Sequence, residues 1–131
     1  MKVRGRVVSG ALSGTPLVEY HFYQLVGTLR FEPYKGTLDI KLNREIDVRK
    51  FATRRIERVL MDGSSHVDLV LAEIMLIITR GDSETRHKCW AMQRTSGVIK
   101  RNVIEIIDRH SLRGKYSLND GDAVEIEFLK K

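Results

Sequence analysis

A hydroxyl and a carboxylate stand two residues apart just after a Pro-Tyr-x-Gly turn. They are Thr37 and Asp39, and they open a stretch that alternates polar and apolar residues as far as Leu42. Side chains at i and i+2 of a strand point to the same face, so this spacing places both oxygens together. Mg²⁺ prefers hard oxygen ligands and keeps waters and substrate phosphates in its other positions. The pair could therefore seat magnesium, and a turn followed by an ordinary edge strand is the competing interpretation.

Two other segments could bind phosphate. Gly10–Gly14 follows the first predicted strand, and its glycines would let successive backbone N–H groups approach an oxyanion. It is neither a Walker A motif nor a dinucleotide fingerprint, so a simple turn explains it equally well. His110–Arg113 predicts a short helical turn with N–H donors at its start and the forked cation of Arg113 nearby. A connector helix with Leu112 packed inward is the alternative there.

Glu105 is a carboxylate placed among apolar neighbours. It alternates with two isoleucines and therefore shares a strand face with Val103 and Ile107. A buried carboxylate needs a partner, which a hydroxyl-bearing ligand or a structural arginine would provide. Thr95 supplies another hydroxyl at the end of a predicted strand, with nothing distinctive about it on its own.

Strands are the elements that must position these groups. Apolar–polar alternation bounded by turn residues predicts strands over 3–9, 37–42, 55–61, 66–79, 85–93, 103–107 and 123–129. Thr15 could cap a short helix that ends near Gly27, and 111–116 predicts a single helical turn. Six or more short strands in so short a chain favour a closed β-barrel, because closure removes unpaired edges.

Composition limits the class of protein. A chain of 131 residues with 42% hydrophobic and 31% charged residues fits one globular domain spanning 1–131. The net charge of +6 attracts polyanions, and basic residues are densest over 41–58, where acidic ones dilute them. No apolar run reaches transmembrane length, and the basic start lacks the apolar stretch of a signal peptide. Cys89 is the single cysteine, which suits a reducing cytosol, and His87-x-Cys89 lacks the second pair of a zinc site.

Three parts of the chain resemble the archaeal CTP-dependent riboflavin kinases. The central part, which resembles the signature of that family, is Phe31-Glu32-Pro33-Tyr34-x-Gly36-Thr37-Leu38-x-Ile40-Lys41-Leu42-x-Arg44-Glu45. Val7–Gly10 and the tail from Val103 to Val124 resemble the family too. The tail also looks like the swapped-hairpin barrels of AbrB-type transcription factors.

The resemblance implies a fold, a reaction and a set of ligands. The fold would be mainly β, a small six-stranded closed barrel of the cradle-loop type with one or two short helices. The reaction would transfer the γ-phosphoryl group of CTP to the 5′-hydroxyl of riboflavin, giving FMN and CDP with the help of Mg²⁺. We expect a cytoplasmic monomer that binds neither nucleic acid nor a membrane.

Carried over residue by residue, the resemblance implies three sets of contacts. Thr37 and Asp39 would hold Mg²⁺. Thr95 and Glu105 would bind the flavin, with Glu105 orienting the attacking hydroxyl or acting as its base. The residues that would hold the nucleotide are Gly10, Ala11, Leu12, Ser13, Gly14, Thr15, His110, Ser111, Leu112 and Arg113.

This chain departs from the family pattern in three places. The family usually has Asn where this chain has Asp39, which is also a good Mg²⁺ ligand. Its first loop is usually richer in glycine, whereas Ser13-Gly14-Thr15-Pro16 is shorter and carries a proline. Extra residues also separate Thr95 from Glu105.

Two other functions stay open at this stage. One is a basic, AbrB-like DNA-binding β-barrel without enzymatic activity, favoured by the positive charge and the tail. The other is a flavin-binding protein without transfer activity.

Overall fold

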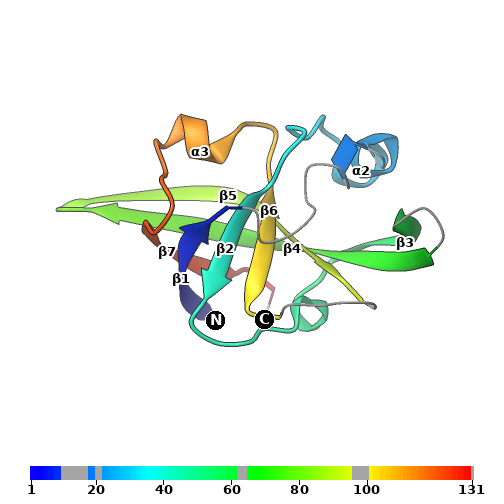
Figure 1. Ribbon diagram of the computed structural model, residues 1–131, viewed down its shortest axis with the longest axis horizontal. Coiled ribbons are helices and arrows are strands. Elements are labelled where there is room, and N and C mark those ends of the chain that lie inside the picture. The colour runs from blue at the N-terminus through cyan, green and yellow to red at the C-terminus, as the bar shows by residue number, and fades with distance from the viewer. Residues whose placement is uncertain (10–17, 20–21, 62–64, 96–100, 131) are drawn as a thin grey trace.

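A computed structural model describes residues 1–9, 18–19, 22–61, 65–95 and 101–130 of the chain (Figure 1). The elements bounded within these residues are seven strands, two α-helices and one short 3-10 helix. In chain order they are β1 (Lys2–Val8), α2 (Phe22–Leu29), β2 (Leu38–Leu42), η1 (Val48–Lys50), β3 (Arg54–Met61), β4 (Ser65–Arg80), β5 (Ser83–Arg94), β6 (Val103–Ile107), α3 (Leu112–Lys115) and β7 (Ala123–Phe128). The mainly β prediction is therefore confirmed, and each predicted strand is present with small shifts at its ends.

The strands pair in the order β3-β4-β5-β6-β2-β1-β7, all antiparallel, and β4 also pairs with β7. Six strands consequently form a ring of pairings, and β3 lies outside it against β4 alone. The sequence showed two apolar stretches over 66–79, which are one strand of 16 residues. The length of β4 matches its partners. β5 pairs along one edge of β4, and the other edge pairs first with β3 and then, further along the strand, with β7.

Two apolar clusters lie on opposite faces of the ring strands. The inner cluster takes alternate residues of every ring strand, among them Ile40, Ile104 and Ile126. The outer cluster joins Leu25 and Leu29 of α2 to residues of β3, β4, β5 and β6. Residues of β6 are buried on both faces for this reason, which is how a carboxylate in that strand comes to be buried.

Local backbone conformation ends α2, and a capping side chain begins α3. α2 extends two residues beyond the predicted end, and stops where Arg30 takes a left-handed backbone with φ of 65°. Ser111 caps α3 by accepting a hydrogen bond from the Gly114 N–H, as a serine in that position commonly does. α2 and α3 lie at the same end of the ring in Figure 1, opposite the end at which β1 begins. No helix in the described part of the chain is long and apolar enough to cross a membrane.

Gly5 allows β1 to lie close to β2. A Cβ atom at this position would come within 2.7 Å of both Ile40 Cγ2 and the Lys41 carbonyl oxygen. We expect Gly5→Ala to lower the free energy of unfolding by roughly 1–3 kcal/mol, because one of the two contacts is with backbone that cannot yield by rotation. Urea denaturation followed by circular dichroism measures this change.

Gly27 provides the matched control. It lies within α2, and an added Cβ there would meet no atom within 4 Å. Gly27→Ala should raise stability by roughly 0.5–1 kcal/mol, since alanine loses less backbone entropy in a helix. Equal effects from the two substitutions would contradict the packing argument at Gly5.

Candidate active site

Thr37 and Asp39 lie side by side at the start of β2, as their spacing predicts. The Thr37 hydroxyl donates a hydrogen bond of 2.7 Å to Asp39 Oδ1. The flanking Leu38 and Ile40 belong to the inner cluster, so Asp39 faces outward from the ring. It is nevertheless only 7% exposed. A half-buried hydroxyl and a buried carboxylate are thus held together on the outer face.

Glu105 lies directly opposite Asp39 in the β2–β6 pairing and opposite Met92 in the β5–β6 pairing. It is 4% exposed, and its Oε2 atom has no hydrogen-bond partner among the described residues. Burial raises the pKa of Glu105 to about 7, the charge of Asp39 adds to the rise, and Arg94 acts against it. The Oε2 atom of Glu105, buried beside a second carboxylate, would therefore be stabilised by a proton, a cation or a ligand hydroxyl.

Arg113 reaches from α3 to the end of β1. Its Nη2 atom donates to the Val8 carbonyl at 3.2 Å, to Ser9 Oγ at 3.1 Å and to Asp120 Oδ1 at 2.9 Å. Hydrogen bonds from Ser9 and Arg113 lower the pKa of Asp120, so this anion stays ionised beside the guanidinium. Val8 is the residue that pairs with Asp39 across β1 and β2. A cation predicted to bind phosphate therefore contacts the strand next to Thr37 and Asp39.

The other residues of the predicted nucleotide segment have structural contacts. Leu112 is buried in the inner cluster, so its side chain packs inward. Ser111 caps α3, and the exposed His110 donates its N–H to Asp108 Oδ2. The side chains of Arg113 and of the exposed His110 are consequently what this segment offers a ligand. The predicted loop Gly10–Thr15 lies outside the described residues.

Thr95 lies just beyond the end of β5. Its N–H and its hydroxyl both bond to the Asp68 carbonyl, at 3.0 and 3.3 Å. It stands three residues along the chain from Met92, the β5 partner of Glu105. The hydrogen bonds of Thr95 therefore do not join it to Glu105, whereas Arg94 shares the outward face of β5 with Met92.

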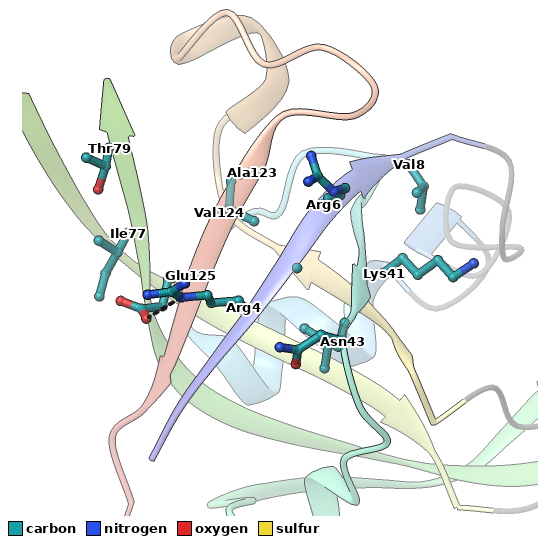
Figure 2. A pocket seen from close by; sticks show the side chains of 12 residues that line it. Arg4, Arg6, Val8, Lys41, Asn43, Ile77, Thr79, Ala123, Val124 and Glu125 are labelled. Carbon is teal, nitrogen blue, oxygen red and sulfur yellow. Dashed lines mark ion pairs between the residues drawn. The ribbon is translucent and has the colours of Figure 1, made fainter. Parts of the chain in front are cut away.

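A cationic groove of about 800 Å³, which sequence reasoning did not find, lies on the outer faces of β1, β2, β4 and β7 (Figure 2). Arg4 and Arg6 line it from β1 and Lys41 from β2. Arg6 and Lys41 are direct cross-strand partners, an arrangement of like charges that costs stability in the absence of an anion. Arg4 lies 4.0 Å from Glu125. The even spacing of Arg4, Arg6 and Val8 in a strand was the signal for this shared face.

Fold and site together define a small antiparallel β protein that places a hydroxyl–carboxylate pair and a second buried carboxylate on paired strands, with an arginine bonded to the end of the next strand. These are the parts that phosphoryl transfer uses, because that reaction needs positioning and charge neutralisation more than covalent chemistry. A family model described as CTP-dep_RFKase, a domain of unknown function numbered DUF120, matches residues 7–128. The chain therefore belongs to the CTP-dependent riboflavin kinase family.

Several archaeal proteins named riboflavin kinase are similar to the chain. The protein from Methanococcus vannielii is 30% identical over 96% of this chain and 96% of its own length. The one from Sulfurisphaera tokodaii is 28% identical over 97% of this chain and 94% of its own length. The one from Archaeoglobus fulgidus is 29% identical over 98% of this chain, which spans 55% of that longer relative.

Proposed function

We propose that the protein is a riboflavin kinase that transfers the γ-phosphoryl group of CTP to the 5′-hydroxyl of riboflavin, giving FMN and CDP. The observation that carries the proposal is the family match over residues 7–128. The description of that family specifies both the acceptor, riboflavin, and the donor nucleotide, CTP. The side-chain geometry alone specifies neither. The site geometry supports the roles given to individual residues below.

Thr37 and Asp39 are the proposed ligands of Mg²⁺. The residues fit the ion, because Asp39 is buried opposite Glu105, whose Oε2 accepts no hydrogen bond from the described part of the chain, and a cation would offset both charges. Clusters of three or more His, Cys, Asp or Glu side chains that could hold a metal do not occur among the described residues. Two protein ligands would leave positions for waters and phosphate oxygens, which is the arrangement Mg²⁺ favours with nucleotides. When bound, the ion would neutralise charge on the phosphates.

Glu105 and Arg113 would act on the two substrates. Glu105 is placed to accept a hydrogen bond from the ribityl chain of riboflavin, and so to orient the attacking hydroxyl or take its proton. The guanidinium of Arg113 would bind phosphate oxygens with its planar fork. Its hydrogen bonds to Val8 and Asp120 hold it in place before any nucleotide arrives. Roles for the loop Gly10–Thr15 and for Thr95 rest on the family resemblance alone.

The remaining parts of the proposal concern architecture and setting. The ring of six paired strands supports a closed barrel of the cradle-loop type. We infer a cytoplasmic monomer that binds riboflavin and CTP. The DNA-binding alternative is less well supported, because no comparison points to it and two basic side chains of the 41–58 segment pair with acids: Arg49 with Asp47, and Arg55 with Asp68.

A riboflavin phosphorylation assay tests the proposal. The protein is incubated with riboflavin and Mg²⁺, in parallel with CTP, ATP, GTP and UTP, and FMN is measured by chromatography. We expect FMN chiefly with CTP. FMN formed mainly with ATP would keep the kinase and overturn its nucleotide preference. Folded protein that makes no FMN with any nucleotide would refute the proposed function.

A further inference from the structure

Asp108 joins three segments of the protein at one point. It follows β6 directly and is 9% exposed. Its backbone carbonyl accepts the Tyr34 N–H at 2.8 Å, and its Oδ2 accepts the His110 N–H at 3.1 Å. The same Oδ2 lies 3.2 Å from Nε2 of His87 on β5, near enough for an ion pair with a protonated ring but without hydrogen-bond geometry.

Two of these segments lead straight to the candidate site. Tyr34 belongs to the turn before β2, where its carbonyl also accepts the Gly36 N–H at 2.8 Å. That turn ends at Thr37, the first of the two proposed metal ligands. His110 opens the segment that ends at Arg113. The Asp108 residue is therefore hydrogen-bonded both to the turn before the metal pair and to the start of the arginine segment.

The third contact ties this junction to the body of the protein. His87 is 14% exposed, and its Nδ1 lies 2.6 Å from the Tyr116 hydroxyl. The Tyr116 N–H in turn bonds to the Leu112 carbonyl at 3.0 Å and closes α3. Burial, followed by the charge of Asp108, raises the pKa of the Tyr116 hydroxyl, so this tyrosine stays a neutral hydrogen-bonding group. His87, Asp108 and Tyr116 thus form a nearly buried polar cluster beneath the arginine segment.

We propose that Asp108 is a positioning residue for nucleotide binding, which fixes the turn before Thr37 and the His110–Arg113 segment relative to each other. The inference rests on the proposed function, because the ligand whose phosphates span the two segments is CTP. Asp108 acts through the residues it holds and does not itself contact the nucleotide. Loss of its carboxylate frees the His110 N–H and loosens the placement of Arg113.

The test compares steady-state constants of Asp108→Ala and Asp108→Asn with those of the wild-type protein. We expect Asp108→Ala to raise the KM for CTP about tenfold, the size of effect that loss of one hydrogen bond to a charged group produces. The KM for riboflavin should change less than about twofold by the same reasoning. Asp108→Asn keeps an acceptor oxygen for the His110 N–H and should restore most of the CTP affinity, a rescue that general destabilisation does not predict.

Asp47→Ala is the matched control. Asp47 also accepts the N–H of the residue two positions on, that of Arg49 at 3.1 Å. It caps η1, however, and its carboxylate pairs with Arg49 and Arg101. This variant should lose stability without a change in the KM for CTP. If Asp108→Ala does not fold, Tyr116→Phe removes the hydroxyl next to His87 and should raise the KM for CTP about threefold.

The outcomes separate this inference from the proposed function. If the wild-type protein forms FMN and Asp108→Ala has the same KM for CTP, the role of Asp108 is overturned and the proposed kinase activity stands. The same holds for an unchanged KM in Tyr116→Phe, if that variant replaces Asp108→Ala. An equal rise in both KM values would also overturn it. A wild-type protein that is folded, makes no FMN and shows no CTP binding by calorimetry would overturn both.

Discussion

Replacing Thr37 and Asp39 together by alanine should abolish Mg²⁺-dependent formation of FMN and leave the fold intact. The double variant removes the two proposed ligand oxygens, Thr37 Oγ1 and Asp39 Oδ1, which lie 2.7 Å apart at the start of β2. A metal ion contributes several kcal/mol to stabilising the charge that develops in the transition state, so we expect kcat to fall about a thousandfold or more. The measurement is FMN production as a function of Mg²⁺ concentration. The fold should survive because Asp39 raises the cost of burying Glu105 as an anion.

A second double variant serves as the control for this experiment. Ser83→Ala with Glu84→Ala also removes one hydroxyl and one carboxylate, but from the beginning of β5 at the hairpin with β4. It should keep wild-type turnover and the same Mg²⁺ dependence. Full activity of the Thr37 and Asp39 double variant would show that these residues do not hold the metal. Loss of activity in both double variants would point to a general effect of net charge or stability.

Glu105→Gln should make the protein more stable above neutral pH and less able to bind riboflavin. The folded-state pKa of Glu105 is raised to about 7 from 4.5, first by burial and then by Asp39. Proton binding by Glu105 therefore stabilises the folded state fully below pH 4.5, and this contribution is lost as the pH rises through about 7. Without divalent cations, we expect the wild-type protein to lose up to roughly 3 kcal/mol over that interval. Glutamine cannot ionise and should remove this part of the pH dependence.

Two measurements check the Glu105 prediction. Urea denaturation at pH 5 and pH 8 in EDTA gives the free energy of unfolding of the two proteins. Quenching of riboflavin fluorescence gives the flavin affinity, which we expect to fall about tenfold, while CTP affinity changes much less. Unchanged flavin affinity would remove Glu105 from the site. An identical pH dependence in both proteins would show that its carboxylate does not control stability.

Local periodicity was enough to predict the strands and the faces of their side chains. The same-face placement of Thr37 and Asp39 follows from the two-residue repeat of a strand, and the burial of Glu105 follows from its apolar neighbours. These relations hold within one segment, which is why they could be read from the chain. Family membership was also evident, because the motif over residues 31–45 is long and contiguous.

Long-range pairing was what the sequence did not reveal. The position of Glu105 opposite Asp39 depends on the register between β2 and β6. The apolar pattern of each strand fixes which face a residue takes, but it does not identify the partner strand or the residue opposite. The sequence indicates a solvent-exposed or phosphate-binding role for Arg113. Its hydrogen bond to the Val8 carbonyl depends on the long-range closure of the ring and could not be predicted locally. His87 reads as an ordinary strand residue, and only the fold brings Asp108 and Tyr116 to it.

Closure of the ring has a consequence for how the protein folds. β1 is paired with β7, with Lys2 opposite Glu127, so the first strand lacks one of its two neighbours until the last has been synthesised. Pairing such distant residues costs loop-closure entropy before the stabilising contacts form. Proteins dominated by these pairings fold in roughly milliseconds to seconds. Arg113 is anchored to Asp120 in the turn before β7 and to Val8 in β1. Arg113, the proposed phosphate-binding residue, should therefore be among the last parts of the protein to become ordered during folding.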